Sequence, residues 1–259
     1  MDGPPASSPK FSLAQADAVT WLRGLPAESI DLVITDPPYE SLEKHRAIGT
    51  TTRLKHSKAS SNDWFSIFPN ARFPELFAEV FRVLRRDRHF YLYCDPETMF
   101  VAKPLAEAAG FKFWKPLIWE KGRIGMGYHY RAKYECVLFF EKGKRKLNDL
   151  GISDVISAPR IVGGYPAEKP PQVSEVLITQ STEAGELVID PFMGSGSVGV
   201  AAATLAAVRE HAPGMLERAE RLLFMPDLLH YWLSGAMVVE RSIASTRGIG
   251  HGPCRPASR

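Results

Sequence analysis

The sequence predicts an α/β domain built on an open, mostly parallel, twisted sheet with helices on both faces. Short apolar runs typical of buried strands alternate along the chain with longer segments typical of helices. Two of these runs end at an acid followed by proline, at Asp36 and at Asp190, and the second continues into a glycine-rich turn. The 259 residues, 45% of them hydrophobic, are enough to bury one sizeable core. We therefore expect one main domain of this class.

The first half of the chain predicts strands and helices in alternation. A short strand is expected near residues 11–13, and a helix in ADAVTWLRGLP, where Gly24 and Pro26 stop it. Residues 32–35 are typical of a parallel strand covered on both faces. Residues 40–62 have little periodicity, which favours a loop. In FPELFAEVFRVLRR, apolar residues recur at helical spacing, and this helix leads into the strand HFYLYCD.

The second half repeats the alternation. The segment ETMFVAKPLAEAAG predicts a helix that Gly110 closes and that Pro104 kinks or interrupts. FKFWKPLIWEK and YECVLFFEKG predict two strands that lie side by side. EKPPQVSEVLITQST predicts a helix with Pro170 near its start. ELVIDPFMGSGSVGVAAATLAAV then predicts a strand, a glycine-rich turn and a helix.

The strands that end at Asp36 and Asp190 are expected to meet at one edge of the sheet. Sheets of this class bind ligands at the carboxyl ends of their strands, where the topology switches direction. If the two strands are neighbours, DPPY and DPFMGSGS face one crevice. The sequence therefore predicts a single site built from two distant pieces of chain.

The turn DPFMGSGS favours a nucleotide-like ligand. Gly194 and Gly196 allow a sharp turn and let a ligand approach the backbone, and the following helix offers free N–H groups. The spacing is not G-x-G-x-x-G, and the turn lacks the lysine of a phosphate-binding loop. On glycine spacing alone, a plain strand-to-helix turn is the alternative.

The motif DPPY favours recognition of a planar amine. Prolines fix their own φ and donate no backbone N–H, so Asp36 and Pro37 form a stiff pair of acceptors. Together they can accept both hydrogens of an amino group on a purine or pyrimidine, and Tyr39 can stack on the ring. Such an amine is a poor nucleophile because its lone pair is delocalised, and two acceptors that favour a tetrahedral nitrogen make that lone pair available. The alternative is a plain turn that ends a strand.

Together the two motifs resemble those of the DNA amino-methyltransferases that use S-adenosylmethionine, over residues 13–208. The catalytic motif precedes the cofactor motif, as in the permuted β group of that family. Further landmarks in the same order are ADAVTWLRGLPAESIDLVITDPPY, RVL, GMGYHYRAKYECVLFFEKGKRKL and YPAEKP. The resemblance implies a Rossmann-like methyltransferase fold with circularly permuted motif order. It also implies methylation of adenine N6 in double-stranded DNA, by base flipping and direct in-line attack.

The resemblance further assigns residues to roles. It implies a catalytic group made of Asp36, Pro37, Pro38 and Tyr39. Along the methionine end of the cofactor it implies contacts from Asp190, Pro191, Phe192, Gly194, Ser195, Gly196 and Ser197. Asp17 is expected near the cofactor's adenine, with a helix cap as the alternative. Lys169 is expected to help close the same pocket, with a solvated lysine at a helix start as the alternative.

Two basic segments are the expected contacts to DNA. They are residues 44–62 and, on both sides of the strand YECVLFFEKG, residues 122–165. The first can hold phosphates near a flipped base, and its alternative is a solvated basic loop. The second mixes basic and aromatic side chains that can contact base edges. The expected DNA-binding residues are Lys44, Arg46, Arg53, Lys55, Arg123, Tyr128, His129, Arg131 and Lys133.

Composition narrows the cellular setting. The net charge of +3 permits a polyanionic partner without requiring one. The three cysteines, Cys94, Cys136 and Cys254, have no metal-ligand spacing, which favours a reducing, cytoplasmic compartment and no metal site. The N-terminus lacks the pattern of a signal or transit peptide, and the apolar run 228–239 is too short to span a bilayer. We expect no membrane partner and a monomer or homodimer. A cognate restriction endonuclease is a candidate partner.

The resemblance ends near residue 208. In the family, the helix after the glycine turn leads into a strand whose final acid binds the ribose, and no such apolar strand follows here, so Glu210 receives no role. We therefore divide the chain into a catalytic domain, 1–208, and a divergent C-terminal region, 209–259, with a tail of disorder-prone composition. Two alternatives stay open: methylation of cytosine N4, because the acid of DPPY favours adenine without requiring it, and a catalytically impaired DNA-binding relative.

Overall fold

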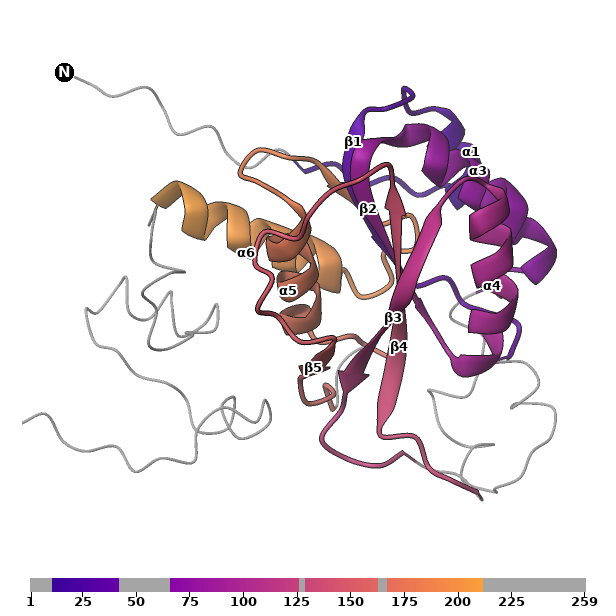
Figure 1. The fold of residues 1–259 in the computed structure, drawn as a ribbon, viewed down its shortest axis with the longest axis vertical. Helices are drawn as coiled ribbons and strands as arrows, with labels where there is room; N and C mark the ends of the chain where they lie inside the picture. Colours follow the sequence, from indigo (N-terminus) through magenta and orange to yellow (C-terminus); the bar gives the residue numbers. More distant parts are fainter. Residues whose placement is uncertain (1–10, 42–65, 126–128, 163–166, 212–259) are drawn as a thin grey trace, which may run out of the picture.

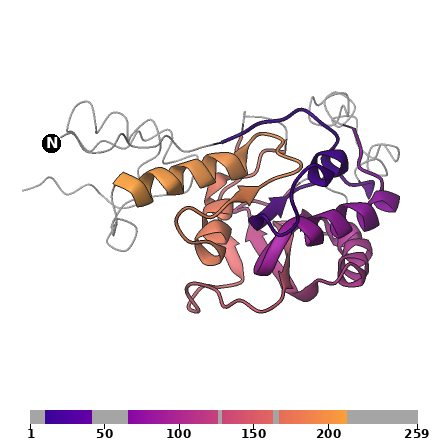
Figure 2. The same ribbon diagram turned by 90° about the horizontal axis from the view of Figure 1, so that it is seen from above.

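A computed structural model describes residues 11–41, 66–125, 129–162 and 167–211. In chain order, the elements of these ranges are α1 (Ala18–Arg23), β1 (Ile30–Thr35), the 3₁₀ turn η3 (Asn70–Arg72), α3 (Phe73–Val83), β2 (Leu84–Cys94), α4 (Pro96–Ala108), β3 (Lys112–Glu120), β4 (Tyr134–Lys142), β5 (Val155–Ser157), α5 (Pro171–Ser181), β6 (Val188–Ile189) and α6 (Ser197–His211). The described strands form one sheet in the order β5-β3-β4-β2-β1-β6. Helices α1, α3 and α4 lie on one side of this sheet, and α5 and α6 lie on the other (Figure 1). Figure 2 shows the same layers from above.

The sheet is mixed in direction. Strand β1 pairs in parallel with β2 and with β6, and β3 pairs in parallel with β5. Strand β4 runs antiparallel to both of its neighbours, β2 and β3. The prediction that FKFWKPLIWEK and YECVLFFEKG lie side by side is therefore confirmed. Strands β4 and β5 also fall inside the range 122–165, so only parts of that basic segment are loop.

Strand β1 is buried on both faces, which explains its nearly continuous apolar sequence. On one face, Val33 packs in a core with residues of α1, α3 and α4. On the other face, Leu32 and Ile34 pack with residues of α5 and α6. The strand at the centre of the site is thus fixed by two separate cores.

Helix α3 ends at Val83 and does not continue through Arg86 as predicted. Leu84 already has extended backbone angles, and the chain continues directly as β2. The buried ammonium of Lys142, from β4, donates to the carbonyl oxygens of Phe81 (2.8 Å) and Leu84 (2.6 Å). Because the carbonyls at a helix end need partners, this distant lysine stabilises the early stop.

Other local predictions had mixed outcomes. Residues 11–13 are not a strand, and the side chains of Phe11 and Leu13 are exposed. Helix α4 passes through Pro104 without interruption. Cys94 and Cys136 are buried free thiols that face each other across β2 and β4.

The remaining predictions concern the ends of the chain. Cys254 and residues 228–239 lie outside the described ranges, as does most of the expected C-terminal region. Glu210 lies within α6, near its end. None of the helices in the described part of the chain combines the length and apolar character that crossing a bilayer requires.

Candidate active site

The two acid–proline motifs leave the sheet side by side. Strand β1 pairs with β6 through Leu32 with Val188 and Val33 with Ile189, so the predicted adjacency of the two strands is confirmed. At their carboxyl ends, the Thr35 hydroxyl donates to Asp190 Oδ1 at 2.8 Å. DPPY and DPFMGSGS therefore begin at the same edge of the sheet.

The glycine-rich turn has left-handed backbone angles that side chains disfavour. Gly194 has φ +52° and Gly196 has φ +80°. The amide of Gly196 donates to the Met193 carbonyl at 2.8 Å, and α6 begins at the next residue. A Cβ at Gly196 would meet no described atom within 4 Å. Backbone conformation therefore explains this glycine, because no described atom would crowd a side chain there.

Asp190 is held by neutral donors. Its Oδ1 accepts from the Thr35 hydroxyl and from the Phe192 amide, the latter at 3.0 Å. Burial raises the pKa of Asp190 to about 7. Within the described ranges, no cationic side chain forms an ion pair with this carboxylate. The site therefore has a half-buried acid that a positively charged ligand group would stabilise.

Asp36 has a cationic partner. Its Oδ2 forms an ion pair with the ammonium of Lys169, which also lies 3.4 Å from Glu135 Oε2. Lys169 is only 8% exposed, so the alternative of a solvated lysine is wrong. Burial raises the pKa of Asp36, and the charge of Lys169 opposes this rise. Burial alone would lower the pKa of Lys169, but the carboxylates of Asp36 and Glu135 raise it, which keeps the ammonium charged.

The rest of DPPY is only partly available to a ligand. The Pro38 carbonyl accepts from the Phe68 amide at 2.7 Å. Among the described residues, neither the Pro37 carbonyl nor Asp36 Oδ1 accepts a hydrogen bond, so the described part of the chain leaves the expected pair of acceptors available. Tyr39 is 8% exposed and packs in the core that contains Phe68. That Tyr39 stacks on a base stays a prediction, and the buried position of the ring gives no support for it.

Asp17 caps helix α1, as the alternative interpretation predicted. Its Oδ1 accepts from the Thr20 amide at 3.1 Å, and Arg72 forms a two-pronged ion pair with its carboxylate at 2.8 and 3.0 Å. The hydrogen bonds from Arg72 hold the pKa of Asp17 well below its usual range. The Arg72 guanidinium lies 5.1 Å from the ring of Phe68, which packs edge-on against Phe192 at 5.0 Å. These contacts connect Asp17 to the glycine-rich turn, and its contact to an adenine stays a prediction.

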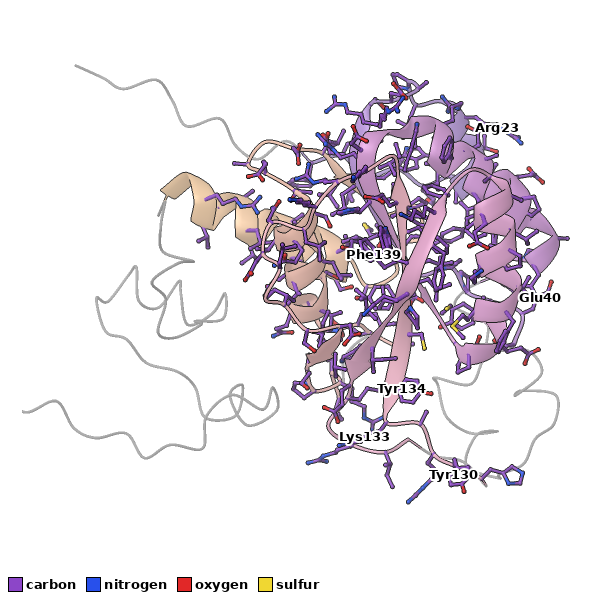
Figure 3. The ribbon with its side chains drawn as sticks, viewed as in Figure 1. Arg23, Glu40, Tyr130, Lys133, Tyr134 and Phe139 are labelled. Atoms are coloured by element: carbon purple, nitrogen blue, oxygen red, sulfur yellow. The ribbon has the colours of Figure 1, made fainter. Side chains whose placement is uncertain are left out.

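The expected DNA contacts divide into two groups. Those that lie outside the described ranges are Lys44, Arg46, Arg53, Lys55 and Tyr128. Those that lie exposed on the β3–β4 connection are Arg123, His129, Arg131 and Lys133, and the last pairs with Glu120 at 2.8 Å. Figure 3 shows Tyr130, Lys133 and Tyr134 where β3 ends and β4 begins. Because Cys136 of β4 lies opposite Cys94 of β2, this connection leaves the sheet at the edge that carries Asp36.

Sequence reasoning missed Glu135, Lys121 and Arg72. Glu135 Oε1 accepts from Lys121 at 2.5 Å, so two lysines hold this acid. An acid near the start of the otherwise apolar YECVLFF was the signal that could have identified Glu135. The described ranges contain no group of three or more His, Cys, Asp or Glu side chains arranged to hold a metal ion.

Comparisons with known proteins agree on one family. The model of the DNA methylase family (N6_N4_Mtase) matches residues 30–160 and 151–208. The DNA adenine methyltransferase YhdJ of Escherichia coli (strain K12) is 24% identical over 232 residues, which are 74% of this chain and 74% of YhdJ. Type II methyltransferase M2.DpnII of Streptococcus pneumoniae is 24% identical over 225 residues, covering 76% of this chain and 82% of the relative.

Solved structures share the fold. TTHA0409 from Thermus thermophilus, complexed with S-adenosyl-L-methionine, has a TM-score of 0.52 and 21% identity, covering 73% of this chain and 82% of that protein. The PvuII DNA methyltransferase, which is cytosine-N4-specific, has a TM-score of 0.56 and 17% identity, covering 73% of this chain and 76% of that protein.

Proposed function

Because the chain belongs to the DNA methylase family, we propose that it methylates the N6 amino group of adenine in double-stranded DNA. S-adenosylmethionine is the methyl donor. The observation that carries the proposal is the parallel pairing of β1 with β6, which brings Asp36 and Asp190 to one edge of the sheet. Since β1 precedes β6 in the chain, the acceptor motif comes before the glycine-rich motif, as in the permuted β group. The catalytic domain then comprises residues 1–208.

The glycine-rich turn, DPFMGSGS, fits the methyl donor. Asp190 lacks a cationic partner among the described side chains, and the donor carries a sulfonium and an ammonium. A Cβ at Gly196 would meet no described atom within 4 Å, which supports room for the donor beside the start of α6. When bound, S-adenosylmethionine supplies an electrophilic methyl group on its sulfonium. The residues that would hold it are Asp17, Lys169, Asp190, Pro191, Phe192, Gly194, Ser195, Gly196 and Ser197.

The two acceptors of DPPY, on Asp36 and Pro37, fit a flipped base. An amino group inside a duplex cannot reach a crevice of this kind, so the base must leave the stack. Asp36 Oδ1 and the Pro37 carbonyl then accept the two amino hydrogens, which localises the nitrogen lone pair for in-line attack on the donor's methyl carbon. The N–C bond would form as the donor's S–C bond breaks, the neutral thioether would leave, and the surplus proton on nitrogen would pass to solvent. No covalent enzyme intermediate is needed, and Cys94 and Cys136 are buried in the core.

The choice of adenine rests on the acid of DPPY. The fold alone does not choose, since a cytosine-N4-specific enzyme shares it. For DNA binding we propose the exposed β3–β4 connection with the basic segment 44–62. M2.DpnII is a type II methyltransferase, which supports a restriction endonuclease as a candidate partner. We propose a cytoplasmic monomer or homodimer.

A product assay tests this function. Purified protein is incubated with mixed-sequence duplex DNA and a donor labelled in its methyl group, and the DNA is digested to nucleosides. We expect label in N6-methyladenine. Label in N4-methylcytosine would support the cytosine alternative, and tight DNA binding without label would identify an impaired relative.

We predict that donor affinity depends on pH through Asp190. Its pKa of about 7 means that the carboxyl is protonated below pH 7 and ionised above it. A cationic ligand binds the ionised form, so affinity should rise with pH up to about 7 and then level off. Below pH 7 the ratio of wild-type to Asp190→Asn affinity should change by up to roughly tenfold per pH unit. Calorimetry of both proteins from pH 5.5 to 8.5 measures this ratio, in which the titration of the ligand's own ammonium cancels. A constant ratio would remove Asp190 from contact with the donor's cation.

A further inference from the structure

Four charged side chains of alternating sign run along the carboxyl edge of the sheet. They come from four parts of the chain: Lys121 after β3, Glu135 in β4, Lys169 before α5, and Asp36 after β1. Glu135 accepts from Lys121 at 2.5 Å through Oε1 and lies 3.4 Å from the Lys169 ammonium through Oε2. Lys169 in turn contacts Asp36 Oδ2.

The arrangement fixes one oxygen of Asp36 and, within the described ranges, leaves the other available to a ligand. Lys169 binds only Oδ2, while Oδ1 has no hydrogen-bond partner among the described residues. A buried ammonium with a single carboxylate partner would follow that carboxylate when it rotates. Glu135 prevents this, because it holds Lys169 from a different strand and is itself held by Lys121. The carboxylate is thus oriented before any ligand arrives, and orientation of this kind accelerates reactions.

We propose that Glu135 is a positioning residue that acts through Lys169 to direct Asp36 Oδ1 toward the target amine. This inference rests on the proposed function. It assigns Glu135 and Lys121 a role in the reaction, although neither belongs to DPPY or to the glycine-rich turn. The Lys169 side chain also lies over the ring of Tyr93, at 5.6 Å, which limits its movement on another side.

The charges around Asp36 give the proposal a directional test. The charged and titratable groups that act on Asp36, or on which it acts, are Lys169, Glu135, Lys121, Asp190, Tyr39, Tyr93 and Cys94. The cation of Lys169 lowers the pKa of Asp36, and the anion of Glu135 raises it. Removing each charge alone should therefore move the pKa of Asp36 in opposite directions.

The experiment compares Lys169→Met, Glu135→Gln and Asp154→Asn. The last is a matched control, since Asp154, directly before β5, forms an exposed ion pair with Lys115 of β3 at 2.8 Å. We expect kcat to fall on the order of 10- to 100-fold for Lys169→Met and Glu135→Gln. KM for the donor should change little in Glu135→Gln and should rise in Lys169→Met, because Lys169 is also among the residues proposed to hold the donor. The acidic limb of the kcat profile should move to higher pH in Lys169→Met and to lower pH in Glu135→Gln. Asp154→Asn should match the wild type.

A second readout needs no activity. ¹³C NMR titration of labelled aspartate carboxyls, with the Asp36 signal assigned by Asp36→Asn, should show the same opposite shifts. Lys169→Arg keeps the cation and should keep the wild-type titration, which covers the case in which Lys169→Met fails to fold. Unchanged Asp36 titration in the folded variants, or shifts in one common direction, would overturn the proposal. If the wild type transfers no methyl group, the proposed function fails, while the NMR titration still decides whether Glu135 and Lys169 control Asp36.

Discussion

Replacing Asp36 with alanine is expected to lower methyl transfer by roughly 10³-fold, enough to abolish it in ordinary assays. The substitution removes the one charged acceptor that DPPY presents to an amine, while the Pro37 carbonyl alone cannot hold both hydrogens. Donor binding should remain close to that of the wild type, because the glycine-rich turn and Asp190 are unchanged. Single-turnover transfer of a labelled methyl group and calorimetry of donor binding measure the two effects separately.

Two companion variants make the Asp36 result interpretable. Removing one member of a buried ion pair leaves the other uncompensated, so loss of folding must be distinguished from loss of chemistry. Asp36→Asn keeps the size of the side chain and should also be inactive, because its amide cannot replace the carboxylate charge. Asp154→Ala removes an acid of an exposed ion pair and should retain full activity. Turnover that survives in a folded Asp36→Ala protein would remove Asp36 from its assigned role.

Replacing Phe77 with alanine is expected to lower the free energy of unfolding by about 3–5 kcal/mol. Phe77 of α3 is fully buried, with its ring stacked on Phe73 at 5.2 Å and tilted against Phe90 of β2 at 6.0 Å. The substitution leaves a cavity between helix and sheet. Urea unfolding measures the loss, and Phe100→Ala on α4 is the control, because Phe100 is 75% exposed and its removal should change stability by less than about 0.5 kcal/mol. Equal losses for both variants would contradict the described packing of α3.

The central geometry could be predicted from the sequence because it depends on local signals and a general rule. The apolar run before Asp36 is typical of a doubly covered strand, and β1 is buried on both faces. The rule that ligands bind at strand carboxyl ends then brought Asp36 and Asp190 together, as the pairing of β1 with β6 confirms.

Other parts of the fold depend on contacts that no local pattern contains. The end of α3 depends on Lys142, whose partner Leu84 is 58 residues away in the chain. Strand β5 has only three residues, two of them exposed, and it is defined by its pairing with β3. Neither feature changes the periodicity of the sequence around it.

The charges of the site were the least predictable part. Lys169 and Asp36 are separated by 133 positions in the chain. Nothing in a sequence indicates that a lysine near a helix start is buried. The ion pairs of Glu135 could not be predicted from the residues around it, because folding brings Lys121 and Lys169 to its two carboxylate oxygens. Asp17 had two interpretations that the sequence left open, and its hydrogen bond to Thr20 confirms the helix cap.

The strand order separates the sheet into two halves with different tolerance for divergence. The strands that carry Asp36 and Asp190 lie on one side of β2, and the β3–β4 hairpin lies on the other. The tip of that hairpin, between Lys121 and Glu135, can therefore lengthen, shorten or exchange residues without altering the register between β1 and β6. Sequence divergence at this tip can therefore change what the hairpin contacts while Lys121 and Glu135, at its base, keep their ion pairs.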